Sequence, residues 1–143
     1  PKQDALANVR SAQALRGGWL HSGDIGRMDA DGYVFIVDRV KDMINLSGFK
    51  VWPAEVEQYL YKLPQVQEVA VYGLPHPEKG ELVVAAVVPR PGQPLTADEV
   101  IAYCRANIAA YKVPARVDIV TELPKSPTGK ILKRVLRDQA GKP

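Results

Sequence analysis

The stretch Leu82-Val83-Val84-Ala85-Ala86-Val87-Val88 is the longest apolar run in the sequence, and it decides the fold class. A short, unbroken apolar run bounded by turn-forming residues is typical of a buried strand. The run is far too short to span a bilayer, for which a helix needs about 20 apolar residues. It therefore predicts a buried sheet strand and no integral membrane segment.

Further strands and helices are predicted on both sides of this strand. In chain order, the apolar spacing gives a helix over 54–63, a strand over 66–72, the strand over 82–88, a helix that begins after Thr96, a strand over 115–120 and a helix over 131–138. Pro53 suits the first position of a helix, and Thr96 with Glu99 forms a capping box. This order predicts an α+β unit, with a sheet of about three strands flanked by helices.

A β-hairpin is predicted ahead of this unit. The strings Arg27-Met28 and Tyr33-Val34-Phe35-Ile36-Val37 flank the turn Asp29-Ala30-Asp31-Gly32, in which Gly32 can adopt a positive φ. A hairpin of this size is too small to own a core, so we expect a boundary in the charged segment that follows it. Residues 1–16 are compatible with a helix, and residues 19–24 are predicted to be a loop.

Composition excludes several classes of protein. The 143 residues are 46% hydrophobic and 24% charged, which argues against disorder, collagen and coiled coil. The single cysteine, Cys104, cannot form an internal disulfide, so a reducing compartment and a cytoplasmic location are expected. The net charge of +3 is too low to indicate nucleic-acid binding. The basic residues between 125 and 137 lack interleaved aromatic residues, which favours a solvated helix face.

No metal site is predicted from the residue pattern. Asp29-x-Asp31-Gly32 lacks the remaining ligands of a calcium-binding loop. His21 and His76 are far apart in sequence and, with one cysteine, match no zinc pattern.

The strongest local motif is Leu123-Pro124-Lys125-Ser126-Pro127-Thr128-Gly129-Lys130. Its two prolines hold the segment extended and Gly129 allows a sharp turn, which presents Lys130 at the tip of a loop. The motif is not a P-loop, because Pro124 and Ile131 stand where a P-loop has glycine and serine or threonine. Two interpretations stay open. Lys130 is either a solvated surface lysine or a mobile cation delivered to a phosphate or a carboxylate.

Two further groups carry chemistry. Asp24 and Arg39 are residue types that bind ribose hydroxyls and phosphates, although a turn cap for Asp24 and a surface salt bridge for Arg39 are the simpler explanation. Ser47-Gly48-Phe49 places glycine beside an aromatic residue, which either lets backbone approach a ligand closely or simply makes a turn.

Taken together, four blocks of sequence occur in a specific order. They are Gly18-Trp19-Leu20-His21-Ser22-Gly23-Asp24; Asp38-Arg39-Val40-Lys41-Asp42-Met43-Ile44, which follows Gly32-Tyr33; Ser47-Gly48-Phe49-Lys50-Val51-Trp52-Pro53-Ala54-Glu55-Val56-Glu57; and Pro124-Lys125-Ser126-Pro127-Thr128-Gly129-Lys130. The chain in this respect resembles the C-terminal part of the acyl-adenylate-forming enzymes, with Ser22 in place of the usual threonine. Tyr111-Lys112-Val113-Pro114 is also similar. Among the branches of this superfamily, the fatty-acid and aryl acyl-CoA ligases resemble this chain most.

The resemblance implies a role for each matching residue. Asp24 binds the ribose hydroxyls of ATP or AMP, and Arg39 binds the nucleotide nearby. Lys41 falls at the hinge about which the small domain rotates. Lys130 enters the active site during adenylation, where it contacts the carboxylate and the α-phosphate.

The same resemblance implies which residues serve the second half-reaction, in which the acyl group passes from the adenylate to CoA. Ser47, Gly48 and Phe49 form the loop that lines the pantetheine tunnel after rotation. Lys50 is a subsidiary candidate, because its position varies between branches. Some relatives have lysine where this chain has Asn45, so no second-step role is carried over to that residue.

The resemblance also implies a division of the chain and a longer parent. Residues 1–37 are expected to be the tail of a large N-terminal AMP-binding domain, 38–42 the hinge and 43–143 the small domain. The large domain, the expected partner, carries the phosphate loop, the acyl pocket and the Mg²⁺ ligands. The parent is then expected to convert a carboxylic acid, in the first place a fatty acid, with ATP and CoA to acyl-CoA, AMP and pyrophosphate, whereas the isolated chain is expected to be inactive.

Two alternatives remain open at this point. An adenylation domain that loads a carrier protein uses the same pantetheine tunnel, so these residues hardly separate it from a CoA ligase. A non-catalytic interaction module could keep the fold without the activity. The acyl substrate and a peripheral membrane association of the parent are not indicated by any residue here.

Overall fold

The computed structural model describes residues 14–141. The chain divides into two compact units, Pro1–Lys41 and Asp42–Pro143, called here the first and second unit. Residues 1–16, which are compatible with a helix, lie mainly outside the described residues, and Ala14, the first described residue, is helical. Where that stretch is described, Leu15–Arg16 forms a short strand, β1.

The first unit contains two antiparallel strand pairs. β1 pairs with β2 (Trp19–Leu20), in the segment that was expected to be a loop, and β3 (Asp24–Met28) pairs with β4 (Val34–Arg39). The turn of the second pair is closed by Asp29, whose carboxylate accepts hydrogen bonds from the backbone N–H groups of Asp31 and Tyr33. Gly32 adopts a φ of 87° there, which confirms the predicted hairpin.

The hairpin of the first unit has no core of its own. Val34 and Ile36 are 66% and 67% exposed, and Phe35, which lies on the opposite face of the strand, is 43% exposed. Two strands cannot bury both of their faces, so these apolar side chains remain accessible. The short 3-10 helix η1 (Val40–Asp42) follows β4.

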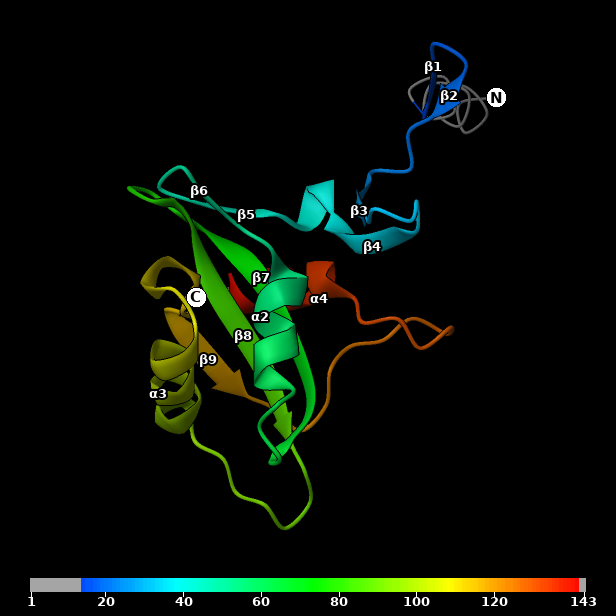
Figure 1. The fold of residues 1–143 in the computed structure, drawn as a ribbon. Coiled ribbons are helices and arrows are strands. Elements are labelled where there is room, and N and C mark those ends of the chain that lie inside the picture. Colours follow the sequence, from blue (N-terminus) through cyan, green and yellow to red (C-terminus); the bar gives the residue numbers. More distant parts are fainter. Residues whose placement is uncertain (1–13, 142–143) are drawn as a thin grey trace, which may run out of the picture. The chain divides into compact units, whose positions relative to one another are not determined.

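The second unit is an α+β domain, which confirms the predicted fold class (Figure 1). Its elements in chain order are β5 (Ile44–Leu46), β6 (Phe49–Val51), α2 (Pro53–Leu60), β7 (Val66–His76), β8 (Gly80–Pro89), α3 (Ala97–Asn107), the 3-10 helix η2 (Ala110–Lys112), β9 (Arg116–Ile119) and α4 (Lys133–Ala140). Pro53 begins α2, and Thr96 and Glu99 form a complete capping box on α3, both as predicted.

The sheet of this unit has five strands rather than about three. The three expected strands are present as β7, β8 and β9, with β8 antiparallel to β7 and parallel to β9. The additional hairpin of β5 and β6 joins the start of β8, where Leu46 pairs with Gly80. Each of these added strands is three residues long, too short to show an alternating apolar pattern in the sequence.

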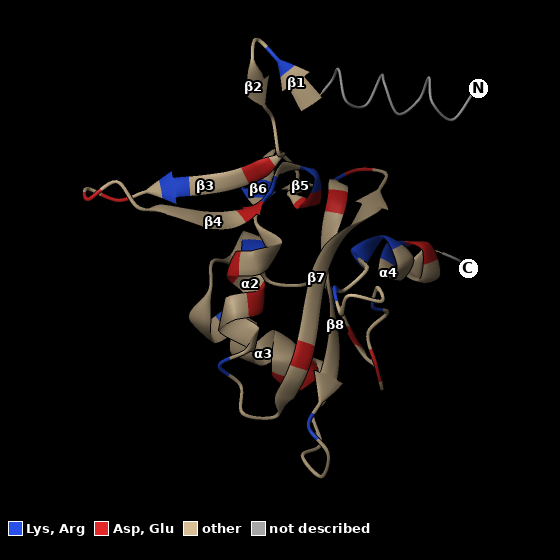
Figure 2. Ribbon diagram, turned by 90° about the vertical axis from the view of Figure 1, so that its right-hand side faces the viewer, with Lys and Arg blue, Asp and Glu red and all other residues tan. Residues whose placement is uncertain are grey.

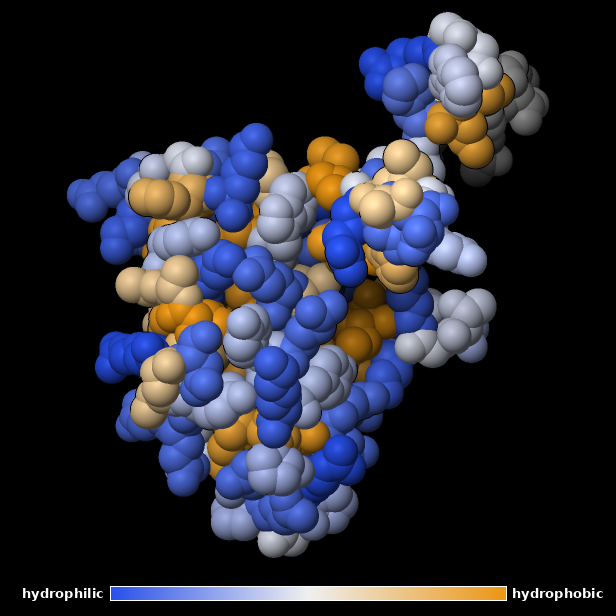
Figure 3. Space-filling model, viewed as in Figure 1, coloured by the Kyte–Doolittle hydropathy of each residue, from blue (hydrophilic) through white to orange (hydrophobic). Residues whose placement is uncertain are grey.

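β8 is covered on both faces. Val83, Ala85 and Val87 belong to a core with residues of α2 and α3, whereas Val84, Ala86 and Val88 belong to a second core with Leu123 and with Leu136 of α4. This two-sided burial explains why the strand is apolar without interruption. The outer surface of the second unit is mainly hydrophilic in the view of Figure 3.

Side chains of α2 occupy the backbone donors on the outer edge of β7. Glu57 accepts a hydrogen bond from the N–H of Val71 at 2.8 Å, and the hydroxyl of Tyr61 accepts one from the N–H of Val69 at 3.3 Å. Glu57 also forms an ion pair with Lys133 of α4 at 2.8 Å, and both side chains are more than four-fifths buried. One carboxylate therefore ties two helices to an edge strand that could otherwise pair with another chain.

We predict that Glu57→Ala lowers the free energy of unfolding by about 1–3 kcal/mol, because it leaves the Val71 N–H and the Lys133 ammonium without this partner. Glu57→Gln keeps an acceptor and should cost less. Glu78→Ala removes an exposed carboxylate of the same unit and serves as the control, with an effect within about 0.5 kcal/mol. Urea unfolding followed by circular dichroism measures all three. Equal midpoints for Glu57→Ala and the control would contradict the assignment.

Candidate functional site

The lysine loop, residues 123–130, is a compact hairpin that ends in an exposed lysine. Lys125 and Ile131 form an antiparallel bridge at its base, and the N–H of Ser126 donates to the carbonyl of Lys130 at 2.8 Å. The N–H of Gly129 donates back to the carbonyl of Ser126 at 2.8 Å, and Gly129 has a φ of 81°. The loop is thus the sharp glycine turn that the motif predicts.

Both ends of the lysine loop are fixed to the second core. Leu123 is buried, and Ile131 packs against the same cluster. Lys125 is paired with Glu68 of β7. The loop is therefore anchored at its base, and its tip projects into solvent.

Lys130, like the exposed Arg134 of α4, differs from three other basic residues nearby in its charge environment. Lys125, Lys133 and Arg137 each pair with a carboxylate, Arg137 with Asp42 at 3.4 Å. Lys130 has no such ion pair within the described part of the chain. Figure 2 shows basic residues, coloured blue on the ribbon, at the start of α4, which follows this loop. The arrangement leaves the Lys130 ammonium group available to an external anion.

The 47–49 turn (Ser47, Gly48 and Phe49) connects β5 and β6. Ser47 and Gly48 both have positive φ, 49° and 88°, the arrangement that favours the tightest β-hairpins. The N–H of Ser47 donates to the carbonyl of Lys79 at 2.8 Å, so the turn is also held by the segment before β8. Lys50 follows it, exposed to solvent and paired through its backbone with Asn45.

An aromatic contact that the sequence analysis did not predict supports this turn. The ring of Phe49 stacks on that of Tyr111 of η2, with centroids 4.9 Å apart, although Phe49 remains 55% exposed. The neighbouring Lys112 forms an ion pair with Glu55 of α2 at 2.5 Å, and this hydrogen bond raises the pKa of Lys112. Local sequence patterns cannot reveal contacts between segments so far apart along the chain.

Asp24 and Arg39 face each other in the first unit. They are partners in the register of β3 and β4, and the Arg39 Nε donates to Asp24 Oδ1 at 2.7 Å. Asp24 also lines a mainly polar hollow of about 520 Å³, together with residues that include His21, Ser22 and Gly23. The structure therefore brings the two expected nucleotide-binding residues together beside a polar hollow.

Lys41 is the last residue of the first unit, and it is exposed. The division between the units thus falls inside the segment 38–42 that was predicted to be the hinge. Rotation about Lys41 stays a prediction. Among residues 14–141, no group of three carboxylate, histidine or cysteine side chains lies close enough to hold a metal ion.

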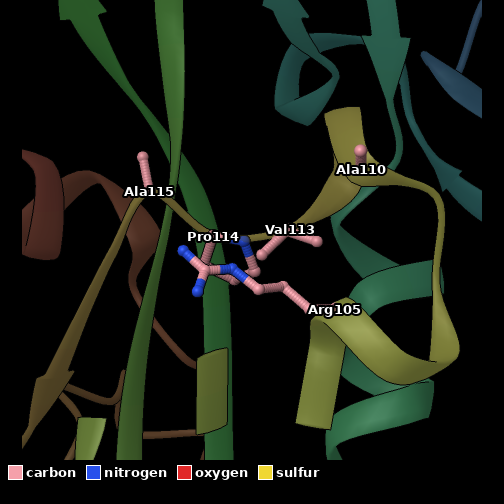
Figure 4. Close-up of a pocket in the computed structure, with 5 residues that line it drawn as sticks. All are labelled: Arg105, Ala110, Val113, Pro114 and Ala115. Carbon is pink, nitrogen blue, oxygen red and sulfur yellow. The ribbon is translucent and has the colours of Figure 1, made fainter. Parts of the chain in front are cut away.

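Several other features lie outside the predicted site. A hollow of about 420 Å³ lies between α3 and the segment 110–115, where the side chain of Arg105 extends toward Pro114 (Figure 4). Cys104 is fully buried, which raises the pKa of its thiol to about 11, so it stays a neutral core residue. None of the helices described between residues 14 and 141 is long and apolar enough to span a membrane.

The lysine loop and the 47–49 turn lie at separate places on the second unit (Figure 1). The lysine loop is anchored to the second core beside α4, whereas the 47–49 turn packs on η2. The second unit is thus a small α+β domain that presents two distinct loops. The β3–β4 hairpin precedes it and carries the paired residues Asp24 and Arg39.

Comparison with known proteins agrees with this class. The sequence-family model of the AMP-binding enzyme C-terminal domain matches residues 55–130, and the chain belongs to that family. It is 47% identical over 131 residues to a feruloyl-CoA synthase of an Amycolatopsis species, and 49% identical over 128 residues to a long-chain-fatty-acid–CoA ligase of Salmonella typhimurium. These alignments cover 92% and 90% of the chain. The crystal structure of ATP-bound MatB from Rhodopseudomonas palustris is similar, with a TM-score of 0.86 and 35% identity over 91% of the chain.

The chain spans about a quarter of the length of these relatives. It covers 27% of the feruloyl-CoA synthase, 23% of the fatty-acid ligase and 26% of the MatB chain.

We predict that Gly48→Ala and Gly92→Ala destabilise the protein equally, by about 1 kcal/mol each, because an alanine at positive φ is strained. Gly92 has a φ of 73° in the loop after β8, and an added Cβ would meet no atom within 4 Å at either position. Chemical denaturation of the two variants measures the costs. A much larger loss for Gly48→Ala would mean that the 47–49 turn is needed to fold the sheet.

Proposed function

We propose that this chain is the C-terminal part of an AMP-forming acid–CoA ligase. The parent would activate a fatty or aryl carboxylic acid as an acyl-adenylate and transfer the acyl group to CoA. The observation that carries this proposal is the presence of two separate site elements, the lysine loop and the 47–49 turn, on one domain of the AMP-binding family.

The lysine loop suits the adenylation step. A carboxylate oxygen of the acid attacks the α-phosphorus of ATP, and pyrophosphate leaves. Negative charge develops on the transferred group, so a positioned cation stabilises the transition state more than the ground state. Lys130 is such a cation, because it is exposed at the end of an internally hydrogen-bonded loop and has no carboxylate partner among the described residues. Mg²⁺ bound to the large domain would neutralise phosphate charge in the same step.

The 47–49 turn suits the thioester step. The thiol of CoA attacks the acyl carbon of the adenylate, and AMP leaves. This attack needs a narrow path for the pantetheine arm, and a tight turn without a bulky side chain at Gly48 lets backbone lie close to that arm. Rotation about Lys41 would exchange one loop for the other at a single reaction centre.

Asp24 and Arg39 suit nucleotide binding. The carboxylate of Asp24 is oriented by the Nε of Arg39 and lines a polar hollow. A carboxylate can accept hydrogen bonds from both hydroxyls of a ribose, and an arginine beside it supplies a positive charge toward the phosphates. We assign these two residues to the nucleotide in both half-reactions. Lys50 remains a subsidiary candidate for contact with CoA.

The relatives support two classes of acid as the substrate of the parent, aryl acids and fatty acids. The feruloyl-CoA synthase and the long-chain-fatty-acid–CoA ligase match the chain almost equally well, at 47% and 49% identity. We propose a cytoplasmic location for the parent, because Cys104, the one cysteine of these 143 residues, is a buried, unpaired thiol.

We predict that Lys130→Ala in the full-length protein raises the barrier to adenylation by roughly 3–4 kcal/mol and leaves thioester formation from preformed acyl-adenylate much less affected. ATP–pyrophosphate exchange across short-chain, long-chain and aryl acids measures the first step, and CoA-dependent release of AMP from the adenylate measures the second. Lys62→Ala removes an exposed lysine outside the site and is the matched control. Equal losses in both half-reactions would contradict the assignment of Lys130.

The same acid panel tests the alternatives. Exchange that proceeds normally while CoA is not acylated would favour an adenylation domain that loads a carrier protein. No exchange with any acid, from a folded protein, would favour a non-catalytic module.

The complementary prediction concerns Gly48→Ala and its control Gly92→Ala in the full-length protein. We expect Gly48→Ala to slow the thioester step about tenfold or more, because a methyl group narrows the proposed tunnel, and to leave adenylation within about twofold. Gly92→Ala carries the same backbone strain away from both loops and should leave both steps unchanged. A similar loss in both variants would show that strain alone, rather than the tunnel, is responsible.

A further inference from the structure

We propose that Ser126 is the positioning residue that holds Lys130 for adenylation, an inference that rests on the proposed function of the lysine loop. Ser126 lies four residues before Lys130 and is partly buried, whereas residues 127–130 are all exposed. The tip of the loop therefore has little packing to hold it, and its shape must come from its own hydrogen bonds.

Ser126 takes part in each of the hydrogen bonds that close the tip. Its N–H donates to the carbonyl of Lys130 at 2.8 Å, and its carbonyl accepts from the N–H of Gly129 at 2.8 Å. Its Oγ accepts from the N–H of Lys130 at 3.1 Å and lies 2.8 Å from the hydroxyl of Thr128. Lys130 is thus bonded to Ser126 through both its N–H and its carbonyl.

Only the contacts of the Oγ depend on the identity of the side chain. A hydroxyl oxygen can accept one hydrogen bond while it donates another, so Ser126 can hold the Lys130 N–H and the Thr128 hydroxyl at once. Alanine keeps both backbone bonds but leaves the Lys130 N–H to solvent. Threonine keeps the hydroxyl and hence the bond.

The position of the Lys130 Cα sets the reach of its ammonium group. A lysine side chain has four rotatable bonds, so its head is well placed only if the backbone beneath it is fixed. A shift of about 1 Å in a group that stabilises a transition state can lower a rate by up to about a hundredfold. The Ser126 hydroxyl therefore acts on the reaction through Lys130, without contact with the reacting atoms.

The test compares Ser126→Ala, Ser126→Thr and the control Thr121→Ala in the full-length protein. Thr121 is an exposed residue on the same connection from β9, and its substitution also removes one hydroxyl. We expect Ser126→Ala to lower the kcat of ATP–pyrophosphate exchange about tenfold, the worth of one hydrogen bond, with KM values and the thioester step within about twofold. Ser126→Thr should restore most of the exchange rate, and Thr121→Ala should equal the wild type.

Trypsin supplies a second readout that does not depend on activity. Cleavage after Lys130 requires the loop to open, so Ser126→Ala should be cut there faster than the wild type, with an unchanged melting temperature. Wild-type exchange that is abolished by Lys130→Ala but unaffected by Ser126→Ala would overturn the inference and leave the proposed function intact. If the wild type exchanges with no acid, the proposed function fails. In that case, equal tryptic cleavage of the wild type and Ser126→Ala would overturn the positioning role as well, and faster cleavage of the variant would support it.

Discussion

Burial of β8 on both faces is the constraint on which the rest of the second unit depends. Side chains alternate across a strand, so Val83, Ala85 and Val87 face one way while Val84, Ala86 and Val88 face the other, and all six are buried. One layer of helices can cover only one of these faces. α2 and α3 cover the first, and the second requires a further layer from the C-terminal segment. A domain with this strand therefore has to return across its own sheet after β9.

The position of the lysine loop follows from this return. Leu123 enters the second core before the loop, Ile131 packs against the core after it, and α4 closes the layer with Leu136. The loop connects these two apolar residues, so core packing fixes its base while its tip makes no contact with the core. The ion pairs of Lys125 with Glu68 and Lys133 with Glu57 hold the flanks to β7 and α2. A site residue on an exposed loop can be well placed when the residues on both sides of it belong to a core.

The sequence predicted the elements whose signals are local. The apolar run of β8, the capping box of α3, Pro53 at the start of α2 and the Gly129 turn each depend on residues within one short segment, and all are confirmed. The strands β5 and β6 were missed because each is only three residues long and because their place in the sheet depends on pairing with Gly80, far along the chain. The stacking of Tyr111 on Phe49 and the pairing of Lys112 with Glu55 were missed for the same reason. Ile131 was expected in a helix but instead bridges Lys125, so α4 begins at Lys133.

The two proposed site elements need a rigid connection if one rotation is to exchange them, and the second unit supplies it. The 47–49 turn is held by the segment before β8 and by η2, and η2 is tied to α2 through Lys112 and Glu55. α2 in turn is joined through Glu57 to β7 and to Lys133, three residues beyond the lysine loop. A chain of packed and charged contacts thus runs from one element to the other through the sheet. Movement of this unit would carry both elements together, so the withdrawal of Lys130 and the arrival of the turn would be one event.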